Sequence, residues 1–253
     1  MTHRMKINIL GSGTCVPSLE RHPCAALVRT ADLSVLVDAG PGTMGQLMKL
    51  GVGIDEIDVI CLSHFHLDHC AEVAPFLFAT KYPGFKRKRP LTLVGGPGLA
   101  DWLDRLSLAF DRSIDMPEDR FSCLELSGRG ETGFPGMRIA HAPMAHKPES
   151  MGYGFRDDTG FYLVYSGDTD ETDSLVTLAE EADILICEAA MPDGQKVQGH
   201  LTPSLAGKMA EQAGVKQLVL THFYPECEEV DMAAQCRQTF SGRVVAAEDL
   251  MAL

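Results

Sequence analysis

The sequence predicts an α/β (α+β) fold in which two β-sheets pack together and helices cover their outer faces. Short apolar runs typical of buried strands recur along the whole chain, and segments with helix start signals lie between them. These strands and helices fall into two successive halves of the chain. Two groups of this kind favour two sheets with the helices packed outside.

The composition is that of an ordinary soluble globular protein, with 253 residues of which 45% are hydrophobic and 23% charged. We find no linker and therefore expect a single domain over residues 1–253. No apolar stretch reaches the length of a membrane span and the first residues do not form a signal peptide, so we expect no membrane contact and a cytoplasmic location. The eight cysteines are scattered without a Cys-x-x-Cys pair, which indicates a reducing compartment.

The first half of the chain carries strand and helix signals in turn. Apolar runs predict strands at 6–10, 24–29, 33–37, 58–62 and 91–94, the second and third joined as a hairpin. Helices are expected at 43–50, 71–80 and 98–110, the first and last directly after glycine-containing turns. Gly11 and Gly13 permit a sharp loop but no helix pattern follows them, so they are not a dinucleotide fingerprint.

The second half continues with predicted strands at 121–126, 137–142, 161–168, 182–187 and 217–220. A glycine-containing, turn-rich segment separates the first two of these strands. Helices are expected at 171–181 and from Pro203 onward, where Thr202 takes the N-cap position and proline the first helical position.

A dense series of possible metal ligands, His64, His66, Asp68 and His69, follows the predicted strand at 58–62. In an extended segment His64 and His66 project to the same side, so they can hold one ion. Asp68 and His69 come where the chain turns helical and could hold a second ion. Imidazole and carboxylate suit zinc, iron or manganese better than calcium. A polar loop with histidines that cap strand and helix ends is the alternative.

Later strands also end in side chains that bind metals or titrate. Asp168, Glu188 and His222 each stand at the end of a predicted strand, and His200 lies just before the helix that begins at Pro203. Asp168 could otherwise cap the helix at 171–181. The recurrence of such residues at strand ends predicts a site at one edge of the sheets.

The His-x-His-x-Asp-His spacing, together with the segments at 10–14 and 218–223, resembles the metallo-β-lactamase superfamily, and within it the ribonuclease Z branch. The resemblance implies an αββα sandwich of two mixed sheets and a binuclear site. The first ion would be held by His64, His66 and His146, and the second by Asp68, His69 and His222, while Asp168 would bridge them. Asp68 would also take part in proton transfer, and Glu188 and His200 in phosphate contact and leaving-group protonation.

Three assignments depend on a choice between neighbouring readings. His146 stands six residues before Gly152-Tyr153, as the metal histidine does in that branch, so we choose it over His141, which we expect to be structural. Asp38 resembles an aspartate behind the metal histidines, although capping of the next helix is an equal alternative. Glu188 follows Cys187 where the branch has a His-Glu-Ala-Thr pattern, which weakens its catalytic assignment.

These features predict a binuclear metal-dependent hydrolase, and we expect a phosphodiesterase in which a hydroxide shared by two divalent ions is the nucleophile. Zinc is the expected metal, with manganese and iron as alternatives. The alternatives among enzymes are a tRNA 3′-processing endonuclease, an arylsulfatase and a lactonase, because all three would use the same set of metal ligands. A metal-binding accessory protein in cofactor biosynthesis is the alternative that is not an enzyme. The sequence leaves the oligomeric state open, including a homodimer.

We expect a small or short-nucleotide phosphodiester as substrate and not tRNA. The net charge is −13, and only residues 156–160 stand where members of the branch that hold tRNA carry a long glycine- and proline-rich arm. One basic cluster runs against this expectation: Lys81, Lys86, Arg87, Lys88 and Arg89. It is either a solvated turn or a lip that steers phosphates toward the site.

Overall fold

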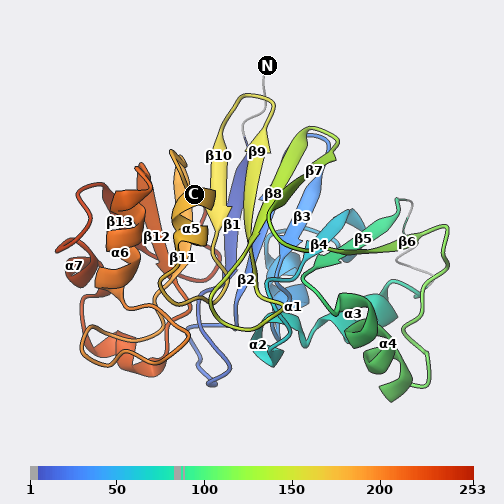
Figure 1. Cartoon of the computed structure of the whole chain (residues 1–253). Helices are drawn as coiled ribbons and strands as arrows, with labels where there is room; N and C mark the ends of the chain where they lie inside the picture. Colours follow the sequence, from blue (N-terminus) through green and yellow to red (C-terminus); the bar gives the residue numbers. More distant parts are fainter. Residues whose placement is uncertain (1–4, 83–86, 88) are drawn as a thin grey trace.

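The computed structural model describes residues 5–82, 87 and 89–253, and these residues fold into four layers (Figure 1). Two sheets face each other at the centre, and helices pack on the outer face of each. The predicted αββα sandwich of two mixed sheets is therefore confirmed. No helix of the described part of the chain has the length and apolar character needed to cross a membrane.

The first sheet contains, in spatial order, β1 (Lys6–Gly11), β2 (Ala25–Arg29), β3 (Ser34–Val37), β4 (Val59–Cys61), β5 (Leu91–Gly95) and β6 (Phe121–Glu125). The strands β1 to β3 pair antiparallel, whereas β3 to β6 pair parallel. The helices on its outer face are α1 (Thr43–Lys49), α2 (Leu67–Cys70), α3 (Val73–Ala79) and α4 (Leu99–Ala109).

The second sheet has the order β13-β12-β11-β10-β9-β8-β7. Its strands are β7 (Gly130–Phe134), β8 (Met137–Pro143), β9 (Met151–Asp157), β10 (Tyr162–Tyr165), β11 (Ile184–Glu188), β12 (Gln217–Thr221) and β13 (Arg243–Ala246). The strands β10 to β13 are parallel and β7 to β10 antiparallel. The helices α5 (Asp173–Leu178), α6 (Pro203–Gln212) and α7 (Met232–Cys236) cover its outer face.

The alternation of side chains along the strands divides the apolar residues among three cores. In β3, Val35 and Val37 face the second sheet, whereas Leu36 between them faces the helices of the first sheet. Both faces of each sheet are covered, so the central strands are buried throughout and largely apolar, as expected for parallel strands buried on two sides.

Several elements differ from the sequence prediction. The segment at 130–134, expected to be a turn, forms β7, and α7 and β13 were not predicted. The helix expected at 71–80 is preceded by a separate turn of helix, α2, so Asp68 and His69 are helical residues. Thr202 occupies the N-cap position of α6, but its side chain makes no capping hydrogen bond.

The topology brings the carboxyl ends of the parallel strands of both sheets to one edge. The chain leaves β4 toward His64, β10 toward Asp168 and β12 toward His222. In Figure 1 this edge lies at the bottom, where α2 is labelled. The end of the chain runs along β1, because Ile9 donates its N–H to Met251 O at 2.9 Å and Leu253 donates its N–H to Ile7 O at 3.0 Å.

Candidate metal centre

The two oxygens of Asp168 face two different sets of histidines. Its Oδ2 lies 3.5 Å from Nε2 of His64 and 3.9 Å from Nε2 of His146. Its Oδ1 lies 3.3 Å from Nε2 of His69 and 3.4 Å from Nε2 of His222. The carboxylate is 3% exposed, comes from the loop after β10 and lies between the two sets of histidines.

The first set matches the ligands expected for one ion. The ligand atoms of His64, His66, His146 and Asp168 all lie within 4.8 Å of one another. His146 reaches the set from the loop between β8 and β9, and its Nε2 lies 3.2 Å from Nδ1 of His66. Four side chains from three separate segments of the chain thus surround one small volume.

The second set contains His69 and His222, with Asp68 slightly further away. Asp68 Oδ2 lies 3.6 Å from Nε2 of His222 and 4.0 Å from Nε2 of His69. The same Asp68 oxygen accepts the backbone N–H of Cys15 at 3.0 Å. Burial alone would raise the Asp68 pKa, but the imidazoles of His222 and His69 beside this carboxylate hold the pKa well below its usual range. Asp68 is therefore an ionised carboxylate.

The donor atoms fit metal ions by charge and by their lack of other partners. Nε2 of His64, His69 and His222 and Oδ1 of Asp168 are buried and have no hydrogen-bond partner. Buried polar atoms are normally satisfied, so four of them directed at one another indicate a missing common partner. Burial, with a smaller effect of the His69 charge, lowers the His64 pKa to about 2, which keeps this imidazole in the neutral form that binds metals. The cluster is thus able to bind metal ions.

Asp38 lies behind the cluster and orients His69. Its Oδ2 accepts the Nδ1–H of His69 at 2.8 Å, the hydroxyl of Ser63 at 2.9 Å and that of Tyr165 at 3.0 Å. This pattern directs Nε2 of His69 toward Asp168. The capping alternative is wrong, because α1 begins after Gly42 and has no side-chain cap. Asp168 is not a cap either, since Thr172 occupies that position in α5.

Glu188 and His200 form a pair beside Asp168. Nδ1 of His200 lies 3.0 Å from Glu188 Oε1, and the two side chains are 13% and 2% exposed. Burial alone would lower the His200 pKa, but the hydrogen bond and the charge of Glu188 outweigh it and raise the pKa. Glu188 also accepts the backbone N–H groups of Thr169, Ala190 and Leu201 at 2.9 to 3.2 Å. Its oxygens are thus occupied within the protein, and it holds His200 in place.

His141 stays outside the metal-ligand groups found among the described residues. Its ring is buried in β8 against the backbone of Gly130. Cys24, which the sequence did not single out, does lie in such a group, with its sulfur within 4.8 Å of ligand nitrogens of His69 and His222. The thiol donates to Gly13 O at 3.2 Å. A single cysteine before a strand gave no signal that could have identified it.

The described part of the basic cluster does not border the metal centre. Arg87 is buried and donates to the carbonyl oxygens of Ile54 and Ile57, while Arg89 pairs with Asp58 at 3.2 Å. These partners precede β4, whereas His64 follows it, so the two arginines lie at the opposite end of the strand. Lys86 and Lys88 lie outside the described residues. The prediction that the basic cluster steers phosphates toward the site is therefore wrong for Arg87 and Arg89.

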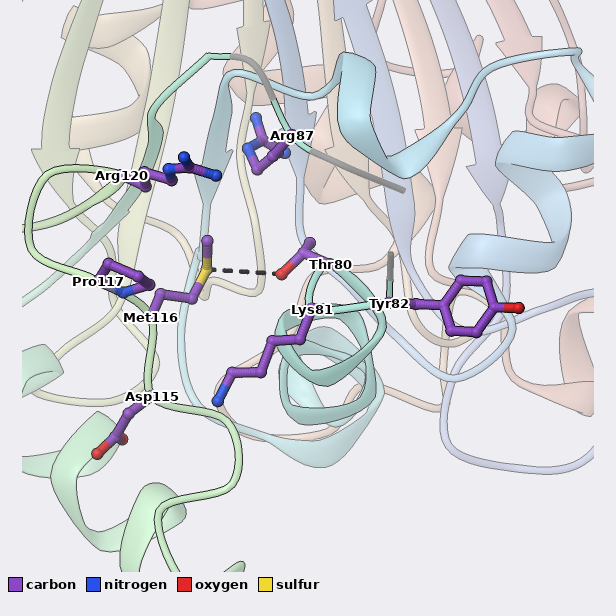
Figure 2. A pocket seen from close by; sticks show the side chains of 8 residues that line it. All are labelled: Thr80, Lys81, Tyr82, Arg87, Asp115, Met116, Pro117 and Arg120. Atoms are coloured by element: carbon purple, nitrogen blue, oxygen red, sulfur yellow. Dashed lines mark hydrogen bonds between the residues drawn. The ribbon is translucent and has the colours of Figure 1, made fainter. Parts of the chain in front are cut away.

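A cavity of about 440 Å³ adjoins this segment (Figure 2). It is lined by Thr80, Lys81, Tyr82, Arg87, Asp115, Met116, Pro117 and Arg120. None of these eight residues was expected to bind metal or substrate, apart from the two basic residues of the cluster. The cavity is thus separate from the histidine–aspartate site.

Comparisons with known proteins agree with this geometry. Residues 34–223 match the model of the beta-lactamase superfamily domain. A ribonuclease Z of Mycobacterium bovis is 30% identical over 270 residues, which cover 97% of this chain and 96% of the relative. The metallo-β-lactamase fold protein YhfI of Bacillus subtilis superimposes with a TM-score of 0.85 at 23% identity, covering 98% of both chains. The short form of human tRNase Z, ELAC1, does so with a TM-score of 0.79 at 25% identity and the same coverage.

The matched region runs from β3 to the residue after His222 and so contains every predicted ligand. It covers well over half of the chain, and the relative at 30% identity is similar along its whole length. The chain therefore belongs to the β-lactamase superfamily and is a metal-dependent hydrolase with the metallo-β-lactamase fold.

Proposed function

We propose that this protein is a binuclear metal-dependent phosphodiesterase that acts on a small or short-nucleotide substrate. The observation that carries the proposal is the position of Asp168, which presents one oxygen to His64 and His146 and the other to His69 and His222. One carboxylate between two sets of imidazoles is suited to two neighbouring cations. His200 beside it adds a titratable group that metal storage alone does not need.

The two ions would be held by His64, His66 and His146 on one side and by Asp68, His69 and His222 on the other, with Asp168 between them. Zinc is the proposed metal because imidazole and carboxylate are its usual ligands, and manganese and iron are the alternatives. Such a pair supplies a nucleophile at neutral pH and neutralises charge on the phosphate.

The protein groups around the ions would move the protons. His200 is the proposed general acid: Glu188 holds its Nδ1 side, so the opposite nitrogen is left to donate a proton to the departing oxygen. Glu188 acts through His200 as a positioning residue, because its own oxygens bind backbone N–H groups. Asp68 is ionised and is the proposed acceptor for the proton of the attacking water.

The relatives support phosphodiester chemistry over the other ester classes. A ribonuclease, as the M. bovis relative is named, cleaves the phosphodiester backbone of RNA. The same relative favours a second candidate, a tRNA 3′-processing endonuclease. Arylsulfatase and lactonase activities would use the same cage, but no observation on this chain favours them.

A substrate panel on zinc- and manganese-loaded protein tests the proposal. Bis(p-nitrophenyl) phosphate should be turned over faster than a phosphomonoester, an aryl sulfate and a lactone with similar leaving groups. The Asp168→Ala protein serves as the control for contaminating hydrolases. Preference for the sulfate or the lactone would contradict the proposal, and specific cutting of precursor tRNA would promote the endonuclease.

A further inference from the structure

Asp249 lies near the end of the chain, outside the residues that match the superfamily model. Its carboxylate is 12% exposed and accepts five hydrogen bonds. Oδ1 accepts the N–H of Ser12 at 3.0 Å and its hydroxyl at 2.9 Å. Oδ2 accepts the N–H of His22 at 2.8 Å, its Nδ1–H at 2.7 Å and the amide of Gln46 at 3.2 Å. Few carboxylates on a protein surface collect so many donors.

These donors stand at the two ends of one loop. Ser12 opens the loop at 12–22 and His22 closes it, so Asp249 fastens both ends to the same group. Two further contacts support the closure: Gly13 donates its N–H to His22 O at 2.9 Å, and Arg21 donates to both Ser12 Oγ and Ala247 O at 2.7 Å. The base of the loop is therefore held by the last residues of the chain.

The loop in turn contacts two of the proposed metal ligands. The N–H of Cys15, inside the loop, is donated to Asp68 Oδ2 at 3.0 Å. The carbonyl of Ser12 accepts the N–H of Phe223, the residue after His222, at 2.9 Å. His222 has a positive φ of 64°, a conformation that is strained for a histidine and needs support from its neighbours. Both contacts concern the second set of ligands.

We propose that Asp249 is a positioning residue for Asp68 and His222, and that it acts through the loop at 12–22. This inference rests on the proposed binuclear site. A single carboxylate with two charged oxygens can satisfy all five donors, whereas an asparagine keeps only one acceptor oxygen and adds two donors of its own. In Asp249→Asn the loop ends lose their common acceptor, and Asp68 and His222 lose their fixed positions.

Zinc affinity and cobalt absorption test this role. Mutation of a group that orients metal ligands typically lowers metal affinity about 10–100-fold. In chelator competition, Asp249→Asn should therefore lower the affinity for the zinc ion held by Asp68 and His222 by about that factor. The visible absorption of the cobalt-loaded variant should also change, because it reports the ligand geometry. Asp157→Asn is the matched control, since Asp157 is a buried carboxylate that also accepts several N–H groups but at the turn between β9 and β10. It should lower the melting temperature and leave both metal readouts unchanged.

A lower melting temperature of Asp249→Asn with unchanged zinc affinity and cobalt absorption would overturn the positioning role and leave the phosphodiesterase proposal intact. Weakened zinc binding in the variant, with no phosphodiester turnover by the wild type, would support the positioning role and contradict the phosphodiesterase proposal. If Asp249→Asn does not fold, Ser12→Ala replaces it. This variant removes one of the five donors and should weaken zinc in the same direction by a smaller factor; unchanged affinity in Ser12→Ala would also overturn the proposal.

Discussion

At the scale of single residues, Asp168 shows how the site tolerates a charge in the interior. Burial alone would raise the pKa of this carboxyl, but the charges of His222 and His69 hold it well below the ordinary value. Asp38 lies on the other side of His69 and accepts its Nδ1–H. Burial alone would lower the His69 pKa, yet these two carboxylates raise it well above the usual value, so the surroundings favour positive charge at this position.

Replacing Asp168 by Ala should therefore lower the occupancy of both metal positions. Wild-type protein should approach two divalent ions per chain in elemental analysis, because each oxygen of Asp168 faces its own set of histidines. His141→Ala is the control, since this histidine lies outside the cluster, and its metal content should match the wild type. A fully loaded His146→Ala protein together with an empty His141→Ala protein would show that the wrong histidine had been chosen.

Replacing His200 by Ala should reduce the rate of phosphodiester cleavage about 10²–10⁴-fold, the usual loss when a general acid is removed. Metal content should stay at the wild-type level, because this variant retains all of the proposed metal ligands. The loss should shrink for substrates with good leaving groups, which need little protonation. An equal loss over a series of leaving groups would exclude His200 as the acid.

The proposed ligands carry a local signal in the sequence, whereas the residues that position them do not. Spacing identifies His64, His66 and His69, because three imidazoles within six residues have few structural uses. Asp38 could equally have been a helix cap, and only its contacts with Ser63 and His69 decide the matter. Asp249 carries no local pattern, since its partners stand more than 200 positions earlier in the chain.

At the scale of elements, the turn between β9 and β10 replaces the arm expected of family members that hold tRNA. Asp157 closes this turn: its Oδ1 accepts the N–H groups of Thr159 and Phe161 at 2.9 and 3.1 Å, and its Oδ2 accepts the N–H of Met5 at 3.1 Å. Burial alone would raise the Asp157 pKa, but the hydroxyl of Thr159, which donates to Oδ1 at 2.6 Å, and these N–H groups outweigh burial and lower the pKa. The charged form is thus part of the folded turn.

Replacing Asp157 by Asn should lower the free energy of unfolding at pH 7 by about 1.5–3 kcal/mol, the range for hydrogen bonds to a charged group. Because the folded-state pKa is depressed, this stabilisation is present above the unfolded pKa of about 3.9 and is lost as the pH falls through the folded value. The difference between the two proteins in chemical denaturation should therefore narrow below about pH 4. A difference independent of pH would mean that the charge of Asp157 is not involved.

Most elements could be predicted because apolar runs and their bounding turns are local signals. β7 was not predicted from the sequence because its glycines, Gly130 and Gly133, are typical of turns. The strand forms because it pairs along its whole length with β8 at the edge of the sheet. β13 and α7 depend likewise on packing against β12 and α6. Such pairing is a property of the assembled sheet, which a window of sequence does not contain.

At the scale of the whole molecule, charge limits the substrates that the enzyme can hold. The chain carries 22 basic and 35 acidic residues. In the described part of the basic cluster, Arg87 binds backbone carbonyl groups and Arg89 pairs with Asp58. These two cations stabilise the start of β4 and lie at the end of the strand opposite the metal centre.

We therefore expect little cleavage of precursor tRNA, although a relative at 30% identity is named ribonuclease Z. Most affinity for nucleic acid comes from basic groups that neutralise phosphates, and a chain at −13 with only residues 158–161 between β9 and β10 in place of an arm offers few of them. Gel-shift binding of precursor tRNA should be weak and should fall steeply between low and physiological salt, while bis(p-nitrophenyl) phosphate is hydrolysed at both. The control is a ribonuclease Z with the arm, assayed on the same RNA. Specific 3′ cleavage by this protein at physiological salt and low enzyme concentration would show that the edge with the active site binds the RNA without an arm. The tRNA 3′-processing endonuclease would then replace the phosphodiesterase as the proposed function.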